Sequence, residues 1–63
     1  MRLTLEAARV NAGLTQQNVA EALKVSVPTV RSWEKGKRSP KVSQFAAMCR
    51  MYAASMDDII LQE

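Results

Sequence analysis

Residues 15–36 decide the fold, and they read TQQNVAEALKVSVPTVRSWEKG. Two short helices are predicted in this stretch, separated by only three residues, 24–26. The first helix follows Thr15, whose hydroxyl is typical of an N-cap, and Asn18 three residues on loosely resembles a capping box. Apolar residues then recur on one face of a helix, at Val19, Ala20 and Leu23.

The second helix of this stretch, residues 27–35, has its own start and stop signals. Ser26 is the predicted N-cap, and Pro28 stands in the first turn, where a missing backbone N–H is harmless. Val30 and Trp33 are spaced to face inward, so we predict that Trp33 is a core residue. Gly36 ends the helix.

A connection this short between two helices is the geometry of a helix-turn-helix, and Val25 is predicted to fill the crevice between them. The outer face of the second helix combines apolar and hydroxyl side chains, which suit base edges, with cations, which suit phosphates. Its members are Val27, Pro28, Thr29, Arg31, Ser32 and Lys35. The sequence therefore predicts a recognition helix that contacts bases in the major groove of duplex DNA.

The distribution of charge supports this prediction. The chain has nine Lys and Arg against six Asp and Glu, a formal net charge of +3. Within residues 24–41 Glu34 is the only acid, whereas the basic residues are Lys24, Arg31, Lys35, Lys37, Arg38 and Lys41. Such a segment is typical of a polyanion-binding face, although a solvated surface would look the same. Its position at a predicted recognition helix favours phosphate contact by the basic loop.

The flanking sequence completes a single all-α domain of residues 1–63. A first helix is predicted from apolar residues at Leu5, Ala8 and Ala12, and Gly13 ends it. A fourth helix carries the apolar residues Val42, Phe45, Met48, Cys49 and Tyr52. Ser55 is predicted to cap a fifth, containing Met56, Ile59 and Ile60.

Ten positions and short runs with consistent spacing carry a family resemblance. They are Arg9, residues 12–16 (AGLTQ), Val19, Ala20, Leu23, Val25, Ser26, residues 30–36 (VRSWEKG), Pro40 and residues 54–60 (ASMDDII). Over about residues 4–61 the chain resembles the Cro/phage-repressor type of helix-turn-helix protein, also called the xenobiotic-response-element family. The resemblance implies a compact five-helix lambda-repressor-like fold and a homodimer bound to a near-palindromic operator.

The resemblance also assigns roles to residues. Gln16 would contact the sugar-phosphate backbone and buttress the recognition helix, and Arg9 and Glu34 would form a structural ion pair. The full predicted DNA-binding set is Gln16, Gln17, Val27, Pro28, Thr29, Arg31, Ser32, Lys35, Lys37, Arg38 and Lys41.

Three departures from the family pattern bear on function. Lys24 stands where the family usually has glycine, so it is expected to adopt a strained left-handed conformation. Ala53 likewise replaces a common glycine after the fourth helix. Val27-Pro28 replaces the glutamine or asparagine that selects adenine, and this pair offers only apolar contact, for example with a thymine methyl. Base recognition then depends on Arg31, together with Thr29 and Ser32. A salt bridge is the alternative role for Arg31, but no acid lies four residues away.

Other functional classes fit the sequence less well. The chain has no histidine and one cysteine, Cys49. We therefore predict no disulfide, zinc site, cofactor or enzyme activity. Cys49 is expected to be a small buried hydrophobe. Asp57 and Asp58 are interpreted as first-turn acids rather than metal ligands. No segment has the length of a membrane span or the pattern of a signal peptide, so a cytoplasmic protein is expected.

Two functional hypotheses remain open at this point. The first is a transcriptional regulator of the Cro-like or repressor type, which dimerises through the predicted helices four and five. The second is an interaction module, such as an antirepressor or antitoxin, that binds a partner protein.

The predicted fifth helix carries three consecutive apolar residues, Ile59, Ile60 and Leu61. They cannot all be buried in so small a domain, and at least one of them is expected to be exposed.

Overall fold

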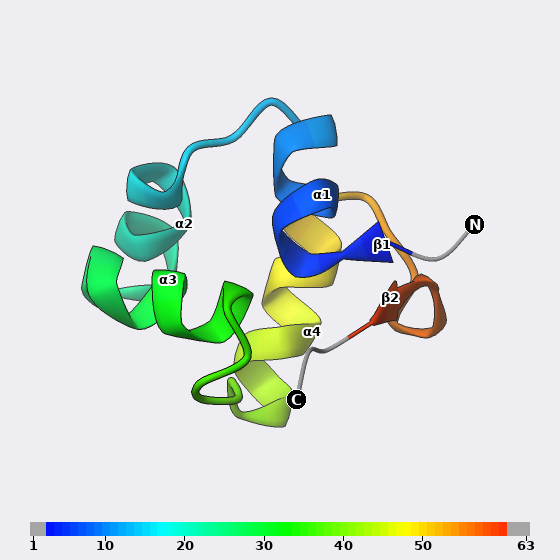
Figure 1. The fold of residues 1–63 in the computed structure, drawn as a ribbon. Helices are drawn as coiled ribbons and strands as arrows, with labels where there is room; N and C mark the ends of the chain where they lie inside the picture. Colours follow the sequence, from blue (N-terminus) through cyan, green and yellow to red (C-terminus); the bar gives the residue numbers. More distant parts are fainter. Residues whose placement is uncertain (1–2, 61–63) are drawn as a thin grey trace.

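The computed structural model describes residues 3–60, which form four α-helices, one 3-10 turn and two short strands (Figure 1). In chain order the elements are β1 (Leu3–Thr4), α1 (Leu5–Asn11), α2 (Gln16–Leu23), α3 (Val27–Glu34), α4 (Val42–Met51), η1 (Met56–Asp58) and β2 (Ile59–Ile60). Figure 1 shows α2 and α3 together on one side of the molecule and the two strands on the other, with α4 between them. None of the helices in residues 3–60 is long and apolar enough to cross a bilayer.

Side-chain caps fix where the helices begin. Thr15 Oγ1 accepts a hydrogen bond from Asn18 N at 3.0 Å, and Asn18 Oδ1 accepts one from Thr15 N at 2.9 Å, a complete capping box. Ser26 Oγ accepts from Thr29 N at 3.3 Å. The N-caps predicted at Thr15, Ser26 and Ser55 are therefore confirmed.

The core draws side chains from every helix. Its buried apolar members are Leu5, Ala8, Val19, Ala20, Val30, Trp33, Met48, Cys49, Tyr52 and Ile59. Trp33 is thus a core residue, as predicted, and burial raises the pKa of the Cys49 thiol, which fits a small buried hydrophobe. Two residues predicted on apolar faces are exposed instead. Ala12 lies one residue beyond α1, and Val42 is the first residue of α4, before that helix reaches the core.

The chain end differs from the prediction of a fifth helix. After the 3-10 turn η1, Ile59 and Ile60 form β2, which pairs in parallel with β1 in the register Leu3↔Ile59 and Thr4↔Ile60. β-Branched isoleucines favour an extended backbone, and the start of the chain supplies the pairing partner. The described structure is therefore mostly helical with one small sheet. Ile60 is exposed while Ile59 is buried, and Leu61 lies outside the described residues.

Candidate nucleic-acid interface

The turn between α2 and α3 is short and strained. Lys24 in this turn has a φ of 58°, the left-handed conformation that was predicted for it. Ala53, after α4, replaces the other glycine and also has a positive φ, 53°. Val25 donates its backbone N–H to Ala20 O at 3.0 Å, and its half-buried side chain packs against the core. The apolar turn residue therefore helps to fix how α3 lies on α2.

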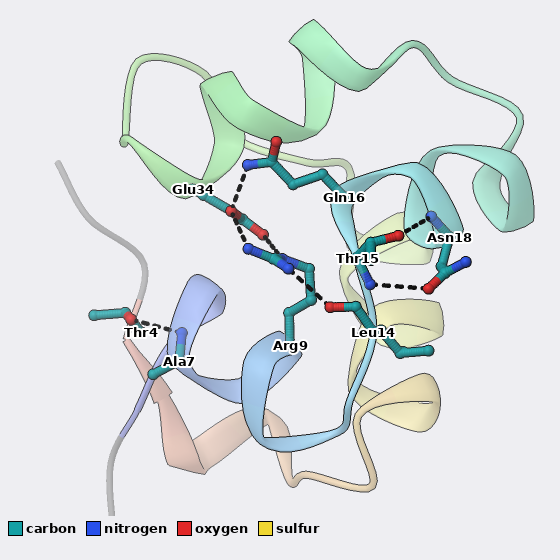
Figure 2. A network of polar contacts seen from close by, with 8 residues as sticks. All are labelled: Thr4, Ala7, Arg9, Leu14, Thr15, Gln16, Asn18 and Glu34. Carbon is teal, nitrogen blue, oxygen red and sulfur yellow. Dashed lines mark hydrogen bonds and ion pairs between the residues drawn. The ribbon is translucent and has the colours of Figure 1, made fainter.

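A buried ion pair secures the end of α3 to α1. Arg9 Nε lies 2.7 Å from Glu34 Oε2, and Arg9 Nη1 donates to Leu14 O at 2.8 Å (Figure 2). Only 9% of Arg9 and 5% of Glu34 are exposed, so neither charge is well hydrated and each depends on the other. The hydrogen bond to Glu34 raises the pKa of Arg9. The ion pair implied by the family resemblance is confirmed.

Gln16 extends this network to the first residue of α2. Its Nε2 donates to Glu34 Oε1 at 2.9 Å, so one carboxylate holds both Arg9 and Gln16 (Figure 2). The predicted buttressing of α3 by Gln16 is thereby given a specific contact, while its contact with the DNA backbone stays a prediction. The exposed Gln17 instead donates to Glu21 Oε2 at 3.0 Å, along α2.

The outer face of α3 has exposed and partly covered members. Pro28, Arg31 and Lys35 are exposed and follow one another at spacings of three and four residues, which places them on one side of the helix. Val27, Thr29 and Ser32 are half-buried, and the Val27 side chain packs against the core. Within residues 3–60 the one ion pair is Arg9–Glu34, which leaves the guanidinium of Arg31 free for a ligand.

The basic loop after α3 is held against the end of that helix. Lys37 N and Arg38 N both donate to Ser32 O, at 3.0 and 3.4 Å. The side chains of Lys37, Arg38 and Lys41 are exposed. The backbone contacts hold Lys37 and Arg38 at the end of α3, and the roles of the three cations in DNA binding stay predictions.

Sequence reasoning missed two polar contacts in this region. Gln44 Oε1 accepts from Lys41 N at 2.8 Å and so holds the loop where α4 begins. The Ser26 and Thr29 hydroxyls lie 2.9 Å apart and form a hydrogen bond. Each pair is separated by three residues and follows a local capping pattern, so the spacing of the side chains could have revealed both.

Two packed helices, a three-residue turn and an exposed outer face define a helix-turn-helix domain. A family model described as a helix-turn-helix domain matches residues 1–59, and the chain belongs to this family. It is similar to the HTH-type transcriptional activator BcrR of Enterococcus faecalis, with 29% identity over 59 residues. The match covers 94% of this chain but 29% of that protein, so the chain spans less than a third of its relative. No solved structure matches.

The comparisons confirm the predicted class at its coarser level. The family match supports a helix-turn-helix protein that binds DNA.

Proposed function

We propose that this domain regulates transcription by binding a near-palindromic DNA operator, in the manner of the Cro/phage-repressor type, with α3 in the major groove. The observation that carries the proposal is the division of α3 into a buried side and a free side. Glu34 is fixed by Arg9 and Gln16, whereas Pro28, Arg31 and Lys35 are exposed. A rigid helix with a free polar face is what base recognition requires.

In this proposal the loop cations set affinity and α3 sets specificity. Lys37, Arg38 and Lys41 would contact phosphates, which fixes the position of the protein on the duplex without selecting a sequence. Arg31 would donate to O6 and N7 of a guanine, the contact that suits a free guanidinium in the major groove. The domain acts by occupancy alone, without turnover or a cofactor.

A symmetric dimer would account for a palindromic site. The predicted contact through helices four and five becomes, in the observed fold, a contact through α4, η1 and β2. Met56 and Ile60 are 43% and 41% exposed in that region and would supply apolar surface. The two copies of α3 should then lie about 34 Å apart, one turn of DNA. Replacing Ile60 with lysine should shift the protein toward monomer in sedimentation equilibrium.

The proposal is tested by selecting bound duplexes from a random library and titrating the selected duplex at several salt concentrations. A near-palindrome should be enriched, and affinity should fall steeply as salt rises because cations on the phosphates are released. Arg50→Ala is the control for loss of one positive charge, since Arg50 is exposed on α4 outside the predicted DNA-binding set, and sedimentation equilibrium checks that this variant still dimerises. Binding without enrichment, or without salt dependence, would contradict the proposal and favour a protein partner.

A further inference from the structure

The polar side chains at the first turn of α3 are the N-cap Ser26 and Thr29, and they are bonded to each other. Val27 and Pro28 carry no polar side-chain atoms. Thr29 has a hydroxyl, but its Oγ1 lies 2.9 Å from Ser26 Oγ in a hydrogen bond. Ser26 Oγ also accepts from Thr29 N at 3.3 Å, so the two hydroxyls form one cap. The hydroxyl of Thr29, which the sequence suggested for base contact, is therefore part of the cap, and this exposed pair of hydroxyls keeps one donor proton.

The surface of this turn is therefore mostly carbon, with the exposed Ser26–Thr29 pair of hydroxyls at its start. Pro28 is exposed, and the half-buried Val27 and Thr29 contribute the parts of their side chains that the core leaves uncovered. Arg31, three residues after Pro28, is the first exposed residue of α3 with a charged side chain. The helix thus presents an apolar first turn followed by a cationic second turn.

An apolar surface can distinguish bases in the major groove in one way. The C5-methyl group of thymine is the apolar feature displayed there, and small apolar side chains contact it. Hydrogen bonds to adenine or guanine require donors that Val27 and Pro28 lack. The chemistry of this turn therefore favours a pyrimidine with a methyl group at C5.

We propose that the first turn of α3 recognises the C5-methyl group of a thymine, next to the base that Arg31 contacts. This inference rests on the proposed function, because it requires α3 to lie in the major groove. It goes further by assigning sequence selection to Pro28, with Val27 and the carbon atoms of Thr29. 5-Methylcytosine carries the same methyl group at C5, so the experiment measures binding to it as well as to thymine.

The test uses the full chain and the duplex selected from the unmodified library, in which each thymine is replaced in turn by deoxyuridine. Loss of the contacted methyl should weaken binding about fourfold, the equivalent of ~0.8 kcal/mol for one buried methyl-sized group. Replacing that T·A pair by C·G should also weaken binding, and 5-methylcytosine in the C·G pair should recover the methyl-dependent part. The inference would be overturned if every deoxyuridine duplex bound with the same affinity as the unmodified duplex.

Three variants separate the apolar surface from the hydroxyl. Pro28→Ser should abolish the difference between thymine and deoxyuridine, whereas Thr29→Val, which exchanges the hydroxyl for a methyl group, should keep it. Val10→Ser is the control, because Val10 is 58% exposed on α1, outside the predicted site. Loss of thymine selection in Thr29→Val would show that the hydroxyl makes the contact and would overturn the inference.

The result also separates the inference from the function on which it rests. If no duplex is enriched and binding does not depend on salt, both fail together. If a duplex is enriched and Arg31 selects a base, but deoxyuridine has no effect at any position, DNA recognition stands and methyl recognition is wrong.

Discussion

The two faces of α3, a helix of eight residues, differ in their surroundings: the inner face packs against the core and the outer face is accessible. On the inner face, Val30 and Trp33 are buried and Glu34 is held by both Arg9 and Gln16. On the outer face, Arg31 and Lys35 are exposed and make no ion pair within residues 3–60. Substitution on the inner face should therefore change stability, and substitution on the outer face should change binding alone.

The largest effect is expected from Arg9→Ala, which would leave the carboxylate of Glu34 buried without its cation. We expect the free energy of unfolding to fall by about 3–5 kcal/mol, a large part of what so small a domain has. Urea denaturation followed by circular dichroism measures it. The double variant Arg9→Met, Glu34→Met is the control, because removing both charges should restore part of the loss. If Arg9→Ala leaves the midpoint of urea denaturation unchanged, the proposed difference between the two faces of α3 is wrong.

The core beneath the inner face should also respond to alkaline pH. Burial raises the pKa of Tyr52 to about 12, from an ordinary value near 10. Because the unfolded chain loses the phenol proton first, this contribution to stability is complete below pH 10 and disappears between pH 10 and 12. The expected loss is roughly 3 kcal/mol, from about 1.4 kcal/mol for each unit of pKa.

Tyr52→Phe supplies the comparison for this prediction, since lysines titrate over the same range in both proteins. The difference in unfolding free energy between the two should change with pH, in favour of phenylalanine at high pH. At neutral pH the variant should be at least as stable, because the buried Tyr52 hydroxyl has no hydrogen-bond partner within residues 3–60. Parallel stability curves for the two proteins would contradict the shifted pKa.

On the outer face, Arg31→Ala should relax selectivity by about 1–3 kcal/mol at one base pair. Stability should stay within about 0.5 kcal/mol of the original, as for other exposed residues. Affinities for all single-base variants of the selected duplex, with Arg50→Ala as control, measure the effect. A uniform loss over all sequences would mean that Arg31 contacts a phosphate instead.

A smaller and different effect is expected from Lys37→Ala in the basic loop. Loss of one phosphate contact should lower the slope of log affinity against log salt by about one and weaken all duplexes alike. Titration at four salt concentrations measures that slope. If Lys37→Ala changes the preferred sequence, the division between affinity in the loop and specificity in α3 is wrong.

The smallest effect should come from relieving backbone strain. Lys24 and Ala53 both have positive φ, where glycine is unstrained, so Lys24→Gly and Ala53→Gly should each raise stability by about 1 kcal/mol. Thermal unfolding measures the gain. Ala53 lies after α4, outside the predicted DNA-binding set, so Ala53→Gly should leave DNA affinity unchanged as long as the variant still dimerises. A lower melting temperature in both variants would contradict strain at these positions.

The sequence by itself determined the local features of this protein. The N-caps at Thr15 and Ser26 and the inward positions of Val30 and Trp33 were predicted correctly. Each depends on residues within one or two helical turns, where spacing and side-chain chemistry dictate the outcome. The Arg9–Glu34 pair and the left-handed Lys24 were different, because only the family resemblance indicated them.

Tertiary structure decided where distant segments meet. The pairing of Leu3–Thr4 with Ile59–Ile60 replaced part of the predicted fifth helix. β-Branched isoleucines favour an extended backbone, and Leu3–Thr4 is the strand with which they pair. The contact between Gln16 and Glu34 likewise required α2 and α3 to be packed. Helix periodicity specifies a face but not what covers it, which is why Val42 is exposed although its spacing fits the core.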